Sequence, residues 1–252
     1  MRIGIFLAAI LLILPGSVTP GEAQPQQVQT GSKELADWIM KLVLEKGHEN
    51  EKLKRDLIKY DKTITKSSLE RNPPRVIETS VYEIYGLNGN SFEKLKERNG
   101  QQIRNARSET SKLNFNDILL KRFDFDLKGE ELMDGRGYYI ISFKPKEPIN
   151  SLPFDDRMDE GINRMTGSLY IDMEKFYLKR LEGRLTNSFT RIMNIFEMKD
   201  FSIKFEQEEF EKIIVPKHLE LTYRYRVILG ETHERLEYSY NNRSLNHPPA
   251  KP

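Results

Sequence analysis

Hydrophobic and polar residues alternate over most of the second half of the chain, and short turn segments separate the alternating runs. The clearest run is HLELTYRYRVIL at 218–229, in which every second residue from Leu219 is apolar or aromatic. Glu220, Thr222 and Arg224 lie between these positions. A period of two indicates a β-strand with one dry and one wet face, so we predict an antiparallel sheet here.

Two hairpins are predicted within residues 122–185, and the rest of the chain is organised around them. The first runs over 123–143 and turns at 133–137 (MDGRG). The second runs over 167–181 and turns at 172–175 (DMEK). Short β-rich runs joined by such turns are typical of a meandering antiparallel sheet.

The remaining alternating runs enlarge this sheet. With about nine or ten strands in all, it is expected to curl into a sandwich, barrel or half-barrel, because twisted sheets of that size rarely stay flat. Further strands are predicted at 76–85, 91–98, 189–198, 201–206 and around 236–240.

The segment before the first strand shows a helical pattern instead. An apolar stripe at helical spacing begins after Ser32, and Gly47 is expected to interrupt it before a second helix over 48–60. We predict that residues 32–60 form a helical cover over the dry, concave face of the sheet. Residues 241–252 (NNRSLNHPPAKP) have no apolar face to bury and are predicted to form a mobile tail.

The first 23 residues have the pattern of a signal peptide. Arg2 supplies the positive charge, residues 3–14 form the apolar run, and small residues favour cleavage near Ala23. An apolar run of about 12 residues is shorter than the roughly 20 that span a bilayer, although an uncleaved anchor stays open as an alternative. We predict an exported, periplasmic protein with a single domain over 24–252 and no integral membrane segment.

Composition removes several classes of function. The 40 basic and 38 acidic residues are interspersed and leave a net charge of +2, which gives no reason to expect nucleic acid or an anionic membrane as a partner. The chain contains no cysteine, so it has no disulfide, no thiol nucleophile, no cysteine metal site and no thiol that could carry a lipid.

Candidate chemistry is sparse. The four histidines are scattered and show no metal-binding spacing, and the signatures of serine hydrolases and P-loops are absent from the sequence. Asp124 and Asp126 share one face of a predicted strand, which keeps a carboxylate-using hydrolase open as a third hypothesis. We predict no catalytic residue, no metal, no cofactor and no enzymatic activity.

The regularly alternating aromatic residues have two interpretations. They fill the core of the curved sheet, or they line an apolar cavity suited to acyl chains. The alternation alone favours core filling, because protein interiors are close-packed. It also leaves open which sheet face is concave, since a slip of one residue moves every side chain to the other face.

Three short patterns in the two hairpins carry a family resemblance. The first is formed by Gly129, Glu131, Gly135, Arg136, Tyr139, Phe143, Pro145 and Lys146, the second by Gly167, Leu169, Ile171 and Asp172, and the third by Arg180, Leu181 and Glu182. Together they resemble bacterial outer-membrane lipoprotein-sorting proteins, the periplasmic Lol carrier type (the LolA-like family). The resemblance covers most of the mature chain.

This resemblance implies a fold and a function. The fold is α+β and mainly β, a strongly curved antiparallel sheet that forms an open half-barrel with N-terminal helices over its concave face. The function is to carry the acyl chains of lipoproteins, or other lipids, from an inner-membrane donor to an outer-membrane acceptor. The alternative is a periplasmic sensor or interaction protein that uses the same fold to bind an envelope protein.

The leading hypothesis is therefore a lipid carrier, in which the helices near residues 35–57 act as a movable cover. Buried acyl chain would contribute about 0.8 kcal/mol per methylene. The residues predicted to line the cavity are Leu169, Ile171, Phe201, Ile203, Phe205, Leu221, Tyr223 and Tyr225.

Overall fold

The computed structural model describes residues 30–87, 90–104, 108–110, 118–149, 157–191 and 195–245. The predicted signal peptide and the last seven residues, 246–252, lie outside the described residues. The elements are α1 (Thr30–Leu57), β1 (Ile58–Ser68), β2 (Arg75–Leu87), β3 (Asn90–Arg98), β4 (Gln101–Gln102), β5 (Ser108–Thr110), α2 (Ile118–Arg122), β6 (Phe123–Met133), β7 (Arg136–Pro145), α3 (Arg157–Ile162), β8 (Met165–Asp172), β9 (Leu178–Leu185), β10 (Phe189–Arg191), β11 (Phe196–Phe210), β12 (Ile213–Val227) and β13 (Gly230–Leu245).

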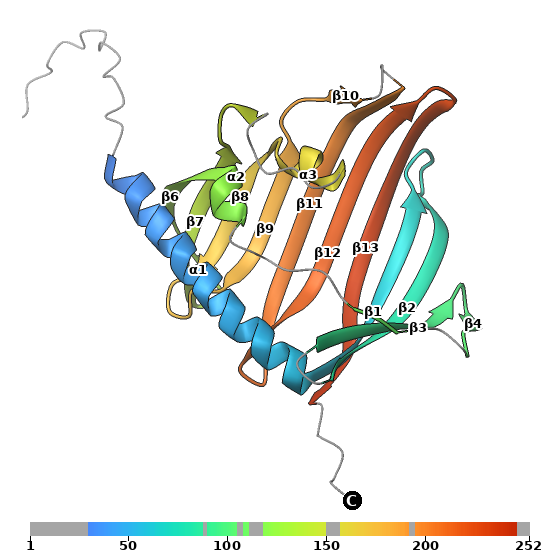
Figure 1. Cartoon of the computed structure of the whole chain (residues 1–252), viewed down its shortest axis with the longest axis horizontal. Helices are drawn as coiled ribbons and strands as arrows, with labels where there is room; N and C mark the ends of the chain where they lie inside the picture. Colours follow the sequence, from blue (N-terminus) through green and yellow to red (C-terminus); the bar gives the residue numbers. More distant parts are fainter. Residues whose placement is uncertain are drawn as a thin grey trace, which may run out of the picture.

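The strands form one antiparallel sheet. Within the described ranges it has 13 strands in the order β4-β3-β2-β1-β13-β12-β11-β9-β8-β7-β6, with β10 beside β11 and β5 beside β3. Because β4 and β6 end the path without pairing to each other, the sheet is open. Figure 1 shows a strongly curved sheet with α1 crossing one end of its strands. The predicted open half-barrel, mainly β, is confirmed.

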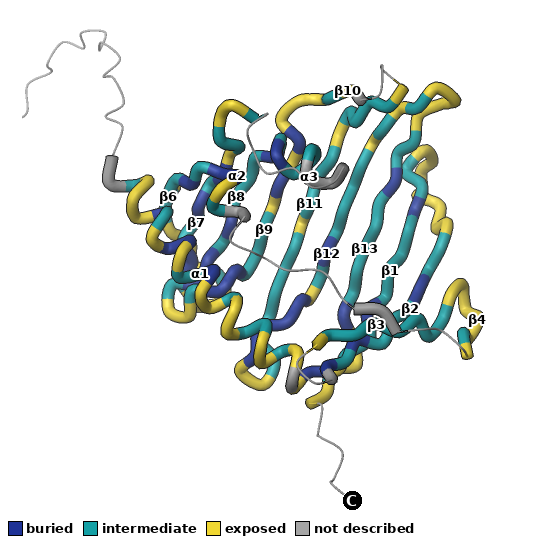
Figure 2. The backbone as a smooth tube through the Cα atoms, in the orientation of Figure 1, coloured by how far each residue is buried: buried dark blue, intermediate teal, exposed yellow. Residues whose placement is uncertain are grey.

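The inner face of the sheet is the face that carries α1. Its core contains Ala36 and Ile39 of α1, which pack on side chains of β6 to β9. Figure 2 shows this concentration of buried residues where α1 meets β6–β9, and mostly intermediate burial along β11 to β13. The buried members of the core are Ala36, Ile39, Met40, Phe123, Phe125, Ile141, Phe143, Met165, Leu169, Ile171 and Leu178.

The helix α1 is continuous, which corrects one prediction. Gly47 lies inside it, and β1 begins at Ile58 directly after the helix ends at Leu57, although the sequence predicted helix up to Tyr60. One glycine costs a helix only about 1 kcal/mol, which the buried residues on either side offset. The strand β1 was missed because charged and hydroxyl residues interrupt its apolar positions. In the part of the chain that the structure describes, no helix has the length and apolar character needed to cross a membrane.

Two contacts fix the second half of α1 to the sheet. The Asn50 side chain donates to the carbonyl oxygen of Ile214 and accepts from the Ile214 amide, each at 2.7 Å. At Gly86, a Cβ atom would lie 1.3 Å from the carbonyl oxygen of Arg55, so only glycine permits this approach of β2 to the helix.

The predicted hairpins are present in the structure. The tight turn between β6 and β7 has left-handed backbone at Asp134 (φ 51°) and Gly135 (φ 77°), as expected of an Asp-Gly hairpin turn. The strands at 189–198 and 201–206 differ from the prediction, because most of them belong to one long strand, β11. The final strand continues to Leu245, which pairs with Ile58 of the neighbouring strand β1, so residues 241–245 of the predicted mobile tail form a strand instead.

Candidate functional site

Beneath the first half of α1 the inner face is nearly filled. The apolar cavity that remains there is about 50 Å³. Ligand sites for small molecules begin at roughly 300 Å³, so this space does not hold an acyl chain in the structure described. Its lining comes from α1 and from β6 to β9, and consists of Met40, Val43, Leu44, Phe123, Phe125, Phe143, Leu169, Ile171, Leu178 and Leu181.

Farther along the sheet, an aromatic strip lies on the same face. Phe196 stacks on Tyr225 with 5.6 Å between ring centroids, and Tyr225 stacks on Tyr223 at 6.0 Å. Phe201 pairs with Tyr223 across β11 and β12, so both side chains point to the inner face. These four residues, which we call the aromatic strip, are half-buried and connect the core to the far end of β12.

Next to the strip, charged side chains line the inner face of β13, β1 and β3. The Lys66 ammonium lies 2.9 Å from the Glu234 carboxylate, to which the Tyr223 hydroxyl donates at 2.8 Å. The Lys62 ammonium lies 2.6 Å from Glu93. Each charge has a partner, as buried ions require. This surface is therefore amphipathic and not uniformly apolar.

Lys62 contacts both a charged and an aromatic side chain of this surface. Its side chain ion-pairs with Glu93 and its ammonium lies 4.8 Å from the ring centroid of Tyr82. It is only 8% exposed. A cation placed between a carboxylate and an aromatic face is held in one geometry, which makes it a candidate for positioning a polar ligand group.

The tyrosines of this face keep their protons at alkaline pH. Burial, and then the hydrogen bond to Glu234, raise the pKa of Tyr223. Burial likewise raises the pKa of Tyr60, Tyr238 and Tyr240. Burial raises the pKa of Tyr177, at the other end of the sheet, to about 12. These hydroxyls therefore remain neutral donors at physiological pH.

We expect the raised pKa values of these tyrosines to make the stability of the fold sensitive to alkaline pH. Unfolded tyrosines ionise near pH 10, so above that pH the unfolded chain releases protons that the folded chain retains, and the free energy of unfolding falls. The loss continues until the raised folded pKa values are reached. Urea unfolding at about pH 9 and about pH 11, together with ultraviolet titration of phenolate, measures both effects. Ionisation of all tyrosines near pH 10 in a chain that stays equally stable would contradict this.

The register places all eight predicted cavity residues on the inner face, in two groups. Leu169 and Ile171 are buried in the core beneath α1, and Phe201, Ile203 and Phe205 pack against that core. The remaining three lie beyond it on β12 and are half-buried: Leu221, Tyr223 and Tyr225.

Sequence reasoning missed the charged half of this face. The alternation Ile58, Tyr60, Lys62, Ile64 and Lys66 was available as a signal, but these residues were assigned to a helix or left without a structure. The ion-pair partners of Lys62 and Lys66 lie on β3 and β13, and no local sequence pattern connects these strands to β1.

A larger hollow lies beside the start of α1, where polar side chains of the outer face line it together with Phe125, Phe143 and Ile203. Its volume is about 960 Å³, and residues at the start of α1 close one side, where the Ser32 hydroxyl donates to Asp126 at 2.8 Å. The candidate pair Asp124 and Asp126 lies here, with Asp124 paired to Lys33 at 3.0 Å. Hydrogen bonds from Lys128 and Ser32 lower the pKa of Asp126, so it is a poor proton donor at neutral pH.

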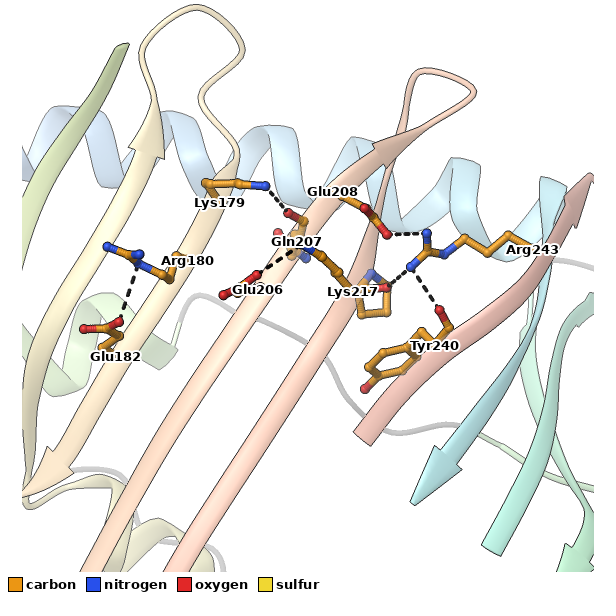
Figure 3. A network of polar contacts seen from close by, with 10 residues as sticks. Lys179, Arg180, Glu182, Glu206, Gln207, Glu208, Lys217, Tyr240 and Arg243 are labelled. Carbon is orange, nitrogen blue, oxygen red and sulfur yellow. Dashed lines mark hydrogen bonds and ion pairs between the residues drawn. The ribbon is translucent and has the colours of Figure 1, made fainter. Parts of the chain in front are cut away.

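A network of polar contacts joins β11, β12 and β13 at the ends of these strands that lie nearest α1. Arg243 pairs with Glu208 and donates to the carbonyl oxygens of Pro216 (3.0 Å) and Tyr240 (3.2 Å), as Figure 3 shows. Lys179 donates to the carbonyl of Gln207 at 3.1 Å and so joins β9 to β11. Among the described residues, no three His, Asp or Glu side chains are grouped so as to hold a metal ion.

No family model and no curated protein matches the chain. Solved structures do resemble it. A LolA superfamily protein from Nitrosomonas europaea is 11% identical, with 83% of this chain and 94% of that one covered and a TM-score of 0.39. A putative outer membrane lipoprotein-sorting protein domain from Vibrio parahaemolyticus is 7% identical, with 87% and 95% covered and a TM-score of 0.43.

A third solved structure, the MucA/MucB complex of Pseudomonas aeruginosa, is 10% identical, with 84% of this chain and 99% of that one covered and a TM-score of 0.27. At these identities and TM-scores, the similarities do not bear on function. A lipoprotein-sorting protein domain, the kind of protein that the hairpin patterns resemble, is named among these solved structures.

Proposed function

We propose that this protein is an exported, periplasmic carrier that binds acyl chains of lipoproteins or other lipids on the inner face of its half-barrel. The observation that supports this most directly is the half-buried aromatic strip, which continues from the core along β11 and β12. Half-exposed aromatic and aliphatic side chains on a concave surface gain free energy when an acyl chain covers them, about 0.8 kcal/mol for each methylene buried.

The filled space beneath α1 favours a position for the acyl chain farther along the inner face. With about 50 Å³ left there, the ligand occupies the part of the inner face beyond α1, along Leu221, Tyr223 and Tyr225. A polar head group at the β13–β1 side would meet Lys62 and Lys66, whose partners Glu93 and Glu234 already compensate their charge. The cargo is therefore expected to be an amphiphile.

The second candidate is a periplasmic sensor or interaction protein that binds an envelope protein on this face. The charged residues on the inner face favour it, because an acyl chain gains nothing from Lys62 and Lys66, whereas a polypeptide offers carboxylates and carbonyls to both. The two candidates therefore predict different ligands. The carrier binds an acyl chain by itself, whereas the sensor or interaction protein binds a polypeptide.

Substitution of Leu221 tests the carrier. Leu221→Asp places a charge in the strip and is expected to raise the dissociation constant of a fluorescent fatty acid at least about tenfold, because the apolar contact is lost and the carboxylate is desolvated. Thr222→Asp is the matched control, since it adds the same charge to the next residue on the outer face. Circular dichroism verifies that both variants fold.

Native mass spectrometry of the protein from its own envelope fraction complements this measurement. A stoichiometric acylated adduct is expected for the wild-type chain and not for Leu221→Asp. A clean unliganded mass, together with no displacement of the fatty-acid probe, would contradict the carrier and favour the protein-binding candidate.

A further inference from the structure

The turn between β12 and β13 exposes two aliphatic side chains at the end of a hairpin whose strands have 15 and 16 residues. Ile228 is 76% exposed and Leu229 is 97% exposed. Ile195 directly precedes Phe196, which pairs with Val227, so it lies beside this turn and is itself 40% exposed. We call Ile195, Ile228 and Leu229 the tip cluster. Figure 1 shows this turn at the end of the sheet away from α1.

The charges around the tip cluster compensate each other. Arg226 pairs with Glu197 at 2.9 Å, and Arg224 lies 3.8 Å from Glu231. Lys199 also pairs with Glu231, and Asp200 lies directly opposite Arg224 in the strand register, so three cations face three carboxylates. The tip therefore has exposed apolar side chains with paired charges behind them. Attraction between net charges is not what would bring a partner here, so apolar contact has to provide the binding energy.

The size of the cluster identifies the class of partner. A stable protein interface buries about 800 Å² on each side, which the three side chains of the tip cluster, counted within the described residues, do not provide. A bilayer makes no such demand, because a few aliphatic side chains that enter the boundary between head groups and acyl chains already gain free energy. The paired charges of the strand ends would then lie at the level of the polar head groups.

The tip cluster is also continuous with the aromatic strip. Val227 and Phe196 pair directly behind the turn, and Tyr225 stacks on Phe196 along the inner face. We propose that the tip cluster inserts into the interface of a phospholipid bilayer and so brings the end of the aromatic strip to the membrane surface. This proposal does not rest on the carrier function, because insertion requires only the exposed side chains.

The absence of cysteine from the sequence allows a position-specific test. Leu229→Cys, labelled with an environment-sensitive nitrobenzoxadiazole dye, is mixed with phosphatidylcholine vesicles. Leu132→Cys is the matched control, because Leu132 is 75% exposed beside the β6–β7 turn, at the opposite end of the sheet. Both variants are purified as the host processes them, so the N-terminal segment affects both equally.

The label at 229 is expected to shift to shorter wavelength and gain intensity, while the label at 132 does not change. Vesicles that also contain phosphatidylglycerol, and high salt, should give the same result because the tip charges are paired. Ile228→Ser combined with Leu229→Ser should lower the vesicle partition coefficient at least about tenfold, and Leu132→Ser should not. No spectral change at 229, or equal changes at both positions, would overturn the proposal, and a partner protein would then have to be sought for the tip.

Discussion

Replacement of Ile39 by aspartate is expected to unfold the half-barrel. Ile39 is 0% exposed and packs in the core between α1 and the inner face of the sheet. Truncation of such a residue to alanine costs about 2–5 kcal/mol, and an unpaired buried carboxylate costs more. Since domains are stable by about 5–15 kcal/mol, Ile39→Asp removes most or all of that stability. Urea unfolding followed by circular dichroism measures this loss.

The matched control is Leu35→Asp, one turn earlier on the same helix. Leu35 is 41% exposed, so its substitution should change the free energy of unfolding by less than about 1 kcal/mol. The comparison also examines the role of α1. If α1 were a cover that swings open, Ile39→Asp would remain folded and bind more fatty-acid probe. That result would support the movable cover that the sequence predicted, whereas the burial of Ala36, Ile39 and Met40 leads us to expect that the first half of α1 is a fixed part of the core.

Removal of Lys62 is expected to have the second large effect. Lys62→Ala leaves the Glu93 carboxylate without its partner, 2.6 Å away, in a partly buried site and also removes the cation beside Tyr82. Breaking a buried ion pair from one side costs about 3–5 kcal/mol, and we expect about 3 kcal/mol because Glu93 retains some contact with water. The urea midpoint at constant slope measures it.

Two further variants make this result interpretable. Lys62→Met combined with Glu93→Leu removes both charges and is expected to be as stable as the wild type or more stable. Lys59→Ala affects a comparable pair, Lys59 and Glu83 at 2.7 Å on neighbouring strands, but Lys59 is exposed and the loss should be below about 1 kcal/mol. Equal losses for Lys62→Ala and Lys59→Ala would show that burial does not strengthen the inner pair.

The double variant also separates the two candidate functions. A carrier that holds its ligand by the acyl chain should bind an uncharged acyl probe, such as a fluorescent fatty-acid methyl ester, equally well without Lys62 and Glu93. A protein that recognises carboxylates or carbonyls through Lys62 should lose its partner in the double variant while its stability is unchanged. The pair was not predicted, so this comparison examines a part of the site that only the structure identified.

The strongly patterned strands were predicted well. The two central hairpins and the strand after Leu219 appear in the structure, because a strict period of two and an Asp-Gly turn are local signals. The register of those strands also places the predicted cavity residues on one common face. The prediction was weakest at β1, where Lys62 and Lys66 occupy inward positions that a local pattern assigns to solvent.

By itself, the sequence determined the two central hairpins and the strand after Leu219, which side chains of these strands share a face, and that the sheet is large enough to curve. These properties depend on neighbours one to four residues apart. Only the tertiary structure decided that β1 lies between β13 and β2, which brings Lys66 to Glu234 and Ile58 to Leu245. It also decided that α1 fills the inner face over β6 to β9, whereas the described side chains of that face along β11 and β12, such as Tyr223 and Tyr225, are half-buried. Contacts between distant segments depend on how all the apolar faces are buried together, and no local pattern carries that information.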